Sequence, residues 1–330
     1  MRHRQIGIAL GLAALFAALT MGPVAATYPG EHNGRIAVGV RANGAANIFT
    51  MRADGTGMRQ LTFGTGFKLC PSYSPDGQTI AYCATAGDAF EIWTMKQNGK
   101  KQRQLTHLGG FATFPDFSPD ASKIAFAGSE GNDPNGEIYV VNARTGGSLH
   151  ALTSCASFAP GCFNDLPVWS PDGTKIAFIH ADDSNDEGVI NQQVWVMDSD
   201  GQHQHPLTSS PVPHDQVADW SPDGSKIVFH AGGFGSGGIW VMNADGSGQH
   251  QVSGCGPTDP SPCAAGDDWG PTWSPDGRKI VFLRDLQALG ISDRPIYVMN
   301  ADGSGQHRIT SAPITPGVPT WQPRGVPQGG

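Results

Sequence analysis

One short motif, an aromatic residue followed by Ser-Pro-Asp-Gly, recurs about every 50 residues and restricts this chain to folds built from hairpins. In the motif, proline fixes φ, aspartate hydrogen-bonds to its own backbone and glycine adopts positive φ, so the chain turns back tightly. The copies span 73–77, 117–121 (with alanine in place of glycine), 169–173, 220–224 and 273–277, and a degenerate sixth copy spans 321–325. Because one isolated hairpin is only marginally stable, the copies predict a repeat architecture.

Each repeat contains four short segments, which predicts four strands per unit. The aromatic segment before the turn is followed by a returning apolar segment, such as Lys-Ile-Ala-Phe at 175–178. The third segments lie at 48–51, 92–95, 138–141, 194–197, 239–242 and 296–299. The fourth segments end in Leu-Thr or a close variant at 61–62, 105–106, 152–153, 207–208, 252–253 and 309–310. This pattern predicts an all-β fold, a six-bladed β-propeller of four-stranded blades.

The phase of the two ends predicts how such a ring closes. The repeats begin on a second strand at 35–38 and finish on a first strand at 318–321. We therefore expect the C-terminal strand to complete the first blade and close the ring, which leaves no exposed sheet edge. Because one repeat type runs throughout, residues 27–330 are expected to form a single propeller domain.

The first residues have the character of an export signal. A basic stretch, Arg2-His3-Arg4, precedes an apolar run at 6–20, and the small residues at 24–26 offer a cleavage site before Thr27. We expect residues 1–26 to be a signal peptide that is removed. The apolar run is short for a membrane span, so no membrane span is expected after cleavage.

The charge balance argues against one class of partner. The chain has 21 lysines and arginines against 29 aspartates and glutamates, a formal net charge of −8. No basic stripe is present to pair with phosphates, so nucleic acid is not an expected partner.

The cysteine count fits an oxidising compartment. The chain has six cysteines, an even number that permits three disulfides behind a secretion signal. Proximity favours Cys70–Cys83, Cys155–Cys162 and Cys255–Cys263, the first of which requires Cys70 to lie opposite Cys83 across a hairpin. A zinc site is a weaker interpretation because no CxxC pair is present.

The repeat as a whole resembles a known family. The motif Trp-Ser-Pro-Asp-Gly-x-Lys-Ile-Ala-Phe, followed by Ile-Trp-Val-Met-Asn-Ala-Asp-Gly and Leu-Thr, is similar to the WD40-like propeller repeats of the TolB family. The resemblance covers nearly the whole chain after residue 26. It implies a periplasmic or secreted propeller that binds protein partners. In the TolB family pattern an N-terminal α/β domain precedes the propeller; because only a short segment separates residue 26 from Arg35, we expect no such domain here.

The order of the strands predicts which end of the propeller carries function. If strands alternate up and down, the Ser-Pro-Asp-Gly and Asn-Ala-Asp-Gly turns share one face, here called the turn face. The longer and more variable connections share the opposite face, here called the loop face, where binding residues usually lie. The candidate binding residues on the loop face are Asp165, His214, Asp215, Asp268, Trp269, His107, His180 and Arg284.

A metal site is a weaker possibility on the same face. One acidic segment, residues 182–187, contains Asp182, Asp183, Asp186 and Glu187, whose carboxylate oxygens suit calcium. The loop lacks the full EF-hand spacing, so a solvated acidic loop is the simpler interpretation. Histidines and aspartates at the mouth of the channel offer a second set of donors.

These observations predict a binding module. We expect a monomeric, exported propeller without a cofactor that binds a protein partner in the periplasm or outside the cell. The alternative is an enzyme, a propeller hydrolase or lyase acting on a sugar or lactone with a divalent cation such as calcium at the channel mouth. An enzyme requires converging carboxylates and histidines, whereas a binding module requires a broader patch with an exposed aromatic, for which Trp269 is the candidate.

Overall fold

The computed structural model describes residues 32–131, 133, 135–155, 162–182, 191–209, 216–232, 237–254, 267–286, 294–310 and 315–324. Every regular element in these ranges is a β-strand. In the same ranges, no helix has the length and hydrophobicity needed to cross a membrane. The predicted signal peptide, residues 1–26, lies outside the described residues.

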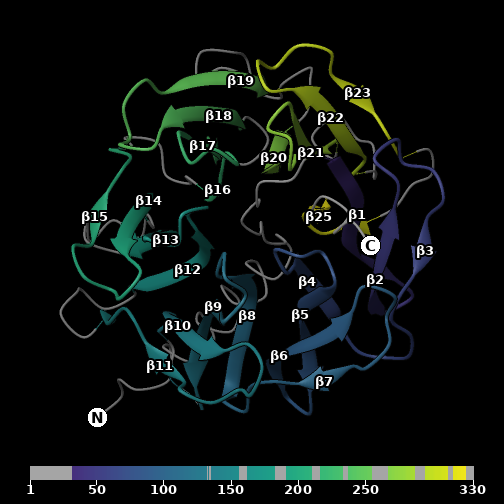
Figure 1. Cartoon of the computed structure of the whole chain (residues 1–330), viewed down its shortest axis with the longest axis vertical. Coiled ribbons are helices and arrows are strands. Elements are labelled where there is room, and N and C mark those ends of the chain that lie inside the picture. Colours follow the sequence, from purple (N-terminus) through teal and green to yellow (C-terminus); the bar gives the residue numbers. More distant parts are fainter. Residues whose placement is uncertain are drawn as a thin grey trace, which may run out of the picture.

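The strands form five sheets arranged around a common centre (Figure 1). The first sheet contains β24 (Thr315–Pro316), β25 (Thr320–Arg324), β1 (His32–Ala42), β2 (Ala45–Met51) and β3 (Arg59–Gln60). The second contains β4 (Lys68–Tyr73), β5 (Thr79–Ala86), β6 (Ala89–Lys96), β7 (Arg103–Gln104), β8 (Gly109–Phe117), β9 (Lys123–Glu130), β10 (Glu137–Asn142) and β11 (His150–Ala151).

The remaining three sheets each have four strands. The third sheet contains β12 (Phe163–Trp169), β13 (Lys175–Asp182), β14 (Asn191–Asp198) and β15 (His205–Pro206). The fourth contains β16 (Gln216–Trp220), β17 (Lys226–Ala231), β18 (Gly238–Asn243) and β19 (His250–Gly254). The fifth contains β20 (Asp267–Trp273), β21 (Lys279–Asp285), β22 (Ile296–Asn300) and β23 (His307–Arg308).

The all-β propeller is thus confirmed, but the expectation of six four-stranded blades closed by the C-terminal strand is wrong. The second sheet has eight strands because β6 pairs in parallel with β8 at Phe90 and Phe111, which joins two repeats into one hydrogen-bonded sheet. The first sheet has five strands because both β24 and β25 pair antiparallel with β1. The repeat count of the sequence therefore does not equal the sheet count of the structure.

The recurring turn is held by its own side chains. In the first copy, the Ser74 hydroxyl donates to Asp76 Oδ1 over 2.6 Å and accepts the Thr79 N–H at 2.9 Å. Asp76 Oδ1 also accepts the Gln78 N–H at 2.9 Å. The same serine–aspartate bond recurs at 2.6 Å in the copies at 118–120, 170–172, 221–223 and 274–276. The motif therefore satisfies its polar atoms locally and leaves little for a ligand.

The threonine of the Leu-Thr segments has a structural task. Its hydroxyl oxygen accepts one backbone N–H of the third strand of the repeat. This N–H lies beyond the end of the short fourth strand, so that strand cannot supply an acceptor for it. The bonds are Ile48 N–Thr62 Oγ1, Ile92 N–Thr106 Oγ1, Ile138 N–Thr153 Oγ1, Val194 N–Thr208 Oγ1 and Ile296 N–Thr310 Oγ1, at 2.9 to 3.1 Å. Because a buried N–H needs a partner, the repeated threonine extends the ladder by one bond.

The strands nearest the centre of the ring, here called the inner strands, are β4, β8, β12, β16 and β20 (Figure 1). Several of them carry a bulge that the sequence periodicity did not predict. Cys70, Phe114 and Leu166 each precede a proline and have φ of 55°, 56° and 55°. The register shifts at each of these places, which indicates a β-bulge that bends the strand. Leu69, rather than Cys70, therefore lies opposite Cys83.

Two predicted disulfides are present despite that shift. Cys70 bonds Cys83 with a Cα–Cα distance of 5.4 Å, and Cys155 bonds Cys162 with 5.5 Å. The bulge brings Cys70 within reach of Cys83 although the two are not directly opposite. Cys255 and Cys263 lie outside the described residues, so the third pairing stays a prediction.

The core is built from the returning strands. Five of them contribute one fully buried aromatic ring at the same position, namely Tyr82, Phe126, Phe178, Phe229 and Phe282, and β1 has the buried Val38 there. Burying such a ring contributes roughly 1.5–3 kcal/mol. Side chains also join neighbouring inner strands, because Asp116 Oδ2 accepts the Trp169 N–H at 2.8 Å. The core therefore fixes the inner strands relative to one another and positions the loops at their ends.

Candidate functional site

The loop face collects the polar candidates at the ends of the inner strands. In the fifth sheet, β20 pairs with β21 so that Asp268 lies opposite Arg284. Arg284 Nε and Nη2 donate to the two oxygens of Asp268 at 2.5 and 2.6 Å, and Asp268 is fully buried. Burial alone would lower the pKa of Arg284, but the hydrogen bonds and charge of Asp268 raise it. Burial raises the pKa of Asp268, and the hydrogen bonds and charge of Arg284 offset part of that effect. The two groups therefore compensate each other within the fold.

Aromatic rings complete the surroundings of this ion pair. The Arg284 guanidinium lies 4.5 Å from the centre of the Tyr297 ring and 5.5 Å from that of Phe282. Stacking on a ring face stabilises a guanidinium and limits its movement. Arg284 is thus committed to internal contacts and is a weak candidate for direct ligand binding.

Trp269 is not the exposed aromatic that we expected. It lies in β20 with 7% of its surface exposed and packs against the main core. The Arg294 guanidinium lies 5.7 Å from its ring centre, and Arg294 Nε is 2.8 Å from Asp285 Oδ2. The ring supports the start of an inner strand and does not offer an open stacking surface.

A second buried chain of polar contacts lies in the third sheet. Asn164 Nδ2 donates to Glu137 Oε2 over 3.1 Å, and its Oδ1 is 2.9 Å from His180 Nδ1. Because an amide oxygen only accepts, His180 Nδ1 is assigned as the protonated nitrogen. The His180 ring lies 4.5 Å from that of Trp195, and its residue exposure is 3%. These contacts join the second sheet to the third and hold His180 in one orientation.

Asp165, the next residue of β12, has the most unusual environment among the candidates. Its Oδ1 accepts the Leu166 N–H at 2.8 Å, and 7% of the residue is exposed. Burial raises the pKa of Asp165 to about 8, and the hydrogen bond offsets only part of that effect. At neutral pH this carboxyl is largely protonated and can donate a hydrogen bond.

The candidates do not converge on one point. Asp165 and His180 belong to the third sheet, whereas Asp268, Trp269 and Arg284 belong to the fifth. His107 is exposed on the connection before β8, with its Nδ1 2.9 Å from Gln104 Nε2. Within the described ranges, no three His, Cys, Asp or Glu side chains lie close enough to hold a metal ion. Asp182 ends β13, and His214, Asp215, Asp183, Asp186 and Glu187 lie outside the described residues.

A row of phenylalanines on the loop face was missed by the sequence analysis. Phe67, Phe90, Phe111 and Phe163 lie where one repeat meets the next, because parallel bridges pair Ala46 with Phe67, Phe90 with Phe111 and Gly136 with Phe163. The rings of Phe67 and Phe90 are 6.5 Å apart, and those of Phe111 and Phe163 are 5.9 Å apart. The signal was present, since Phe67, Phe111 and Phe163 each lie four residues before an inner-strand proline.

The residue at this position, four before the inner-strand proline, is not a phenylalanine in every sheet. In the fifth sheet it is Asp267, whose Oδ1 accepts the Gly237 N–H at 3.0 Å and lies 3.4 Å from His230 Nε2. The loop face is thus aromatic at the second and third sheets, and it carries acidic and histidine side chains at the fourth and fifth. A ring of identical repeats does not need different side chains on different sheets. We therefore take the loop face, where the side chains differ, as the candidate site.

Comparison with known proteins identifies the family. A family model described as the TolB beta propeller domain matches residues 25–156, 66–190 and 115–269. These overlapping matches cover well over half of the chain. The chain belongs to the TolB beta propeller domain family. The comparison with curated proteins gives no match.

Solved structures of the same fold include two TolB proteins. TolB from Acinetobacter baumannii is 21% identical with a TM-score of 0.68, and the alignment covers 88% of this chain and 67% of that one. A putative TolB from Agrobacterium tumefaciens is 23% identical with a TM-score of 0.61, covering 83% of this chain and 88% of that one. An oligogalacturonate lyase in complex with manganese is 15% identical with a TM-score of 0.53, covering 86% and 75%. At these identities the likeness shows the fold alone.

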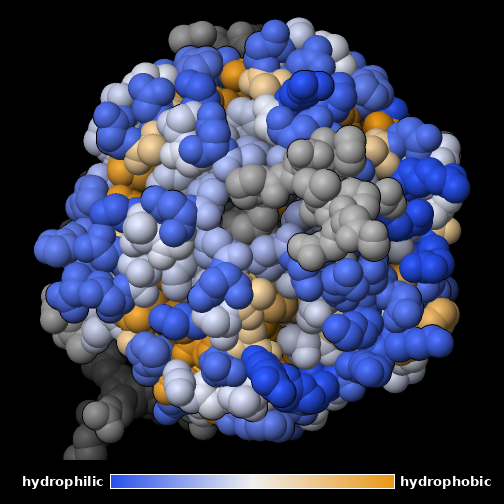
Figure 2. Space-filling view, viewed as in Figure 1, coloured by the Kyte–Doolittle hydropathy of each residue, from blue (hydrophilic) through white to orange (hydrophobic). Residues whose placement is uncertain are grey.

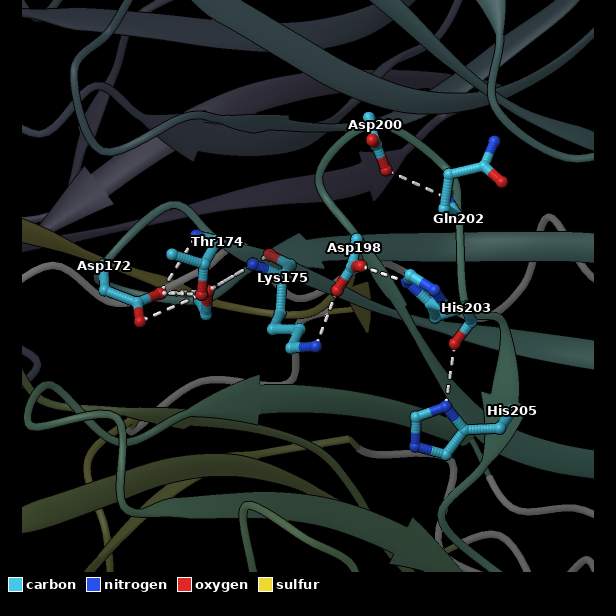
Figure 3. A network of polar contacts seen from close by, with 9 residues as sticks. Asp172, Thr174, Lys175, Asp198, Asp200, Gln202, His203 and His205 are labelled. Atoms are coloured by element: carbon cyan, nitrogen blue, oxygen red, sulfur yellow. Dashed lines mark hydrogen bonds and ion pairs between the residues drawn. The ribbon is translucent and has the colours of Figure 1, made fainter.

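The turn face of this TolB beta propeller carries polar groups that satisfy one another. Lys175 Nζ lies 2.6 Å from Asp198 Oδ1, and His203 Nδ1 lies 2.5 Å from Asp198 Oδ2. Figure 3 marks both contacts with dashed lines. Hydrogen bonds from Lys175 and then His203 lower the pKa of Asp198. The side chain of His203 is 80% exposed, so solvent screens this cluster. The network joins the turns of the third sheet to one another.

The space-filling view agrees with a molecule that hides most of its apolar surface. Hydrophilic residues dominate the face seen in Figure 2, and hydrophobic residues appear there only as small separate patches. Among the described residues, the exposed large hydrophobic side chains are Phe63, Met58 and Leu149, at 69%, 41% and 37%. Phe63 follows the Leu-Thr segment on the connection to β4, so it belongs to the loop face.

Proposed function

We propose that this chain is an exported TolB-like propeller that binds a protein partner through its loop face. The observation that carries the proposal is the group Phe67, Phe90 and Phe163, which are partly buried on the loop face, together with the exposed Phe63 on the same face; Phe111 of the same row is buried. Aromatic side chains dominate the energetics of protein interfaces, where they sit at the centre of the contact. The turn face, in contrast, repeats the same self-satisfied turns.

Two further observations support export. The disulfides Cys70–Cys83 and Cys155–Cys162 fit an oxidising compartment such as the periplasm or the cell exterior. The basic and apolar character of residues 1–26 fits a signal peptide. The resemblance to TolB proteins also supports this proposal, because it implies a periplasmic or secreted propeller that binds protein partners.

A photo-crosslinking experiment tests the binding role. A photoreactive phenylalanine analogue is placed at Phe63 on the loop face or at Leu149 on the turn face of the full-length protein, and whole cells and culture fluid are irradiated. We expect a discrete cross-linked protein from position 63 and none from position 149. Position 149 is a matched control because Leu149 is also an exposed hydrophobic residue. Absence of adducts at 63, or equal adducts at both positions, would contradict the proposal.

One observation favours a second function, an enzyme acting on a sugar or lactone. Asp165 has its pKa raised to about 8 by burial, which is the state of a carboxylic acid suited to proton transfer at neutral pH. The fold accommodates such chemistry, since a lyase bound to manganese shares it. Metal content measured by mass spectrometry on untagged exported protein, compared with Asp165→Asn and Asp215→Ala variants, tests this function. Stoichiometric metal that disappears in the Asp215→Ala variant would favour it over the binding module.

A further inference from the structure

We propose that the turn face of the first two sheets binds the surface of an anionic phospholipid membrane. The contact consists of six exposed cationic residues, here called the basic edge, with exposed apolar side chains beside them. The members of the basic edge are Arg52, Arg59, Lys96, Lys100, Lys101 and Arg103. This inference goes beyond the proposed partner binding, which uses the opposite face of the propeller.

Contacts between successive repeats place the basic edge on one continuous surface. The turn at 96–101 packs on the end of β3, because a Cβ atom at Gly99 would collide with the carbonyl oxygen of Leu61, the residue that follows β3. Arg103 of β7 reaches the next turn, since its Nη2 donates to the Arg144 carbonyl at 2.7 Å. Cations from different repeats therefore lie side by side along the turn face.

The charge of this region is positive although the chain as a whole carries −8. The turns of the first three repeats contain eight lysines and arginines against three aspartates and no glutamate, counted over residues 51–59, 73–79, 96–104, 118–123 and 142–150. The corresponding turns of the last three repeats contain five against seven, counted over 170–175, 198–205, 221–226, 243–250, 274–279 and 300–308. An anionic surface is therefore attracted to one side of the turn face only.

The cations of the basic edge are available to an external anion. Within the described residues, none of the six forms an ion pair with an aspartate or glutamate. Arg52 Nη1 donates to Thr56 Oγ1, and Arg103 Nη2 to the Arg144 carbonyl. A guanidinium has five N–H donors, so each of these arginines keeps donors for a phosphate.

The three aspartates of the same turns bind to their own turns. Hydrogen bonds from Thr56 and then the charge of Arg52 lower the pKa of Asp54. Asp76 and Asp120 each accept hydrogen bonds from a serine hydroxyl and a backbone N–H of their turns. These carboxylates are included in the charge count, which stays positive.

Comparison of the repeats indicates that the fold does not require these cations. Arg52 and Lys96 occupy a position where the other four repeats have an asparagine or aspartate that hydrogen-bonds within the following turn. Those residues are Asn142, Asp198, Asn243 and Asn300. Lys101 has a φ of 57° at a position that is glycine in the first, fifth and sixth repeats. Because a Cβ atom is strained there, a lysine costs stability and indicates a role outside the fold.

Exposed apolar side chains lie on both sides of the basic edge. The residue just before the short fourth strand is a glutamine in four repeats, and its Nε2 donates to a glycine carbonyl of the preceding turn. In the first and third repeats this residue is Met58 or Leu149, 41% and 37% exposed. Cations that bind lipid phosphates, beside apolar side chains that enter the headgroup region, are typical of peripheral membrane binding. The cations also lie along three repeats and do not converge on one point, which favours a membrane over an acidic protein.

Co-sedimentation with lipid vesicles tests the inference on the mature, disulfide-bonded protein. We expect binding to vesicles made of equal parts phosphatidylcholine and phosphatidylglycerol, and none to vesicles of phosphatidylcholine alone. Binding should weaken as sodium chloride is added, because salt screens exposed charges. Replacing Lys100 by glutamine and Lys101 by glycine together should weaken binding about twentyfold, or about fivefold for each cation.

A matched control removes two cations from the other side of the turn face. The double variant Lys226→Gln, Arg278→Gln should bind the anionic vesicles as the wild type does. Lys101→Gly alone should be at least as stable as the wild type in thermal unfolding, because glycine fits the positive φ at this position. Weaker binding by this variant is then not a result of unfolding.

Three results would overturn the inference. They are no binding to the anionic vesicles, equal binding to both kinds of vesicle, and an equal loss of binding in the control variant. A cross-linked protein at position 149 would also overturn it, since it would assign this edge to a protein partner. The three vesicle results leave the loop-face proposal standing, because cross-linking at position 63 tests that proposal separately.

Discussion

Asp219 Oδ2 accepts a 2.7 Å hydrogen bond from the backbone N–H of Trp273, which lies on the inner strand of the next sheet. Asp219 is fully buried and Trp273 is 3% exposed. A carboxylate of one inner strand thus completes the backbone of its neighbour. Asp116 makes the equivalent bond to Trp169, so side-chain bonds between neighbouring strands recur around the centre of the propeller.

Replacing Asp219 by alanine should destabilise the protein by about 1–3 kcal/mol, because the buried N–H of Trp273 loses an acceptor. Urea unfolding followed by tryptophan fluorescence measures the effect. Asp200→Ala is the matched control, since Asp200 also accepts one backbone N–H, from Gln202 at 3.0 Å, but is exposed. Equal loss in the two variants would show that burial of the bond is unimportant.

Stability should fall as the pH rises from about 4 to about 8, in part through Asp165. Burial raises the folded-state pKa of Asp165 to about 8, above its unfolded value, so the folded protein holds this proton more tightly. Its contribution is complete below the unfolded pKa and is lost as the pH passes through the folded pKa. Asp165→Asn should therefore flatten the profile over this range and be more stable than the wild type at pH 9.

Asp245→Asn is the control for that profile. A hydrogen bond from Ser247 lowers the pKa of Asp245, so its contribution is present above the unfolded pKa and is lost only in acid. Between about pH 5 and about pH 9, the stability of Asp245→Asn should therefore change with pH in parallel with that of the wild type. A wild-type profile that stays parallel to Asp165→Asn as well would contradict the buried, protonated carboxyl.

All six cysteines should be oxidised in the exported protein. Titration of thiols in denaturant without reductant should then find none. Two thiols per chain would mean that Cys255 and Cys263 are unpaired, and four or more would contradict the bonds at Cys70–Cys83 and Cys155–Cys162. Replacing Cys70 and Cys83 together by alanine should cost about 2–4 kcal/mol, measured by urea unfolding against the oxidised wild type.

The threonine of the Leu-Thr segments should matter for stability and not for binding. Thr208 Oγ1 accepts the Val194 N–H at 3.1 Å in a buried position, so Thr208→Val should cost about 1–2 kcal/mol while keeping the shape of the side chain. Thr174→Val, at an exposed turn, should cost less. A larger loss at position 174 would mean that the turn, rather than the outer strand, limits stability.

The local structure could be predicted from the sequence because each motif acts within a few residues. Ser74, Asp76 and Gly77 form the internal hydrogen bonds of their turn with residues at most five positions away. The same holds for the pairing of Cys155 with Cys162. The count of sheets was not predictable in this way, since it depends on whether Phe90 and Phe111 of different repeats form a parallel bridge.

The candidate site was predicted less well because exposure depends on packing between sheets. Trp269 was expected to be exposed because it lies outside the repeated aromatic position. It occupies the same inner-strand position as Leu69 and Asp165, each of which is followed by a bulge residue and a proline. Aligning the repeats on that proline would have placed Trp269 inside and would also have aligned Phe67 with its counterparts.

The pairing of β1 with β25 has a consequence for how the protein is made. The Arg35 N–H donates to Gln322 Oε1 across 287 positions of the chain, and Gln322 Nε2 reaches the Gly77 carbonyl at 2.8 Å. Contacts between such distant residues form late, because a long loop has to close first. Until β25 has been synthesised, β1 lacks this neighbour and exposes an unpaired strand edge that can pair incorrectly. The synthesis of β25, rather than the collapse of the chain, sets the earliest moment at which the first sheet can be complete.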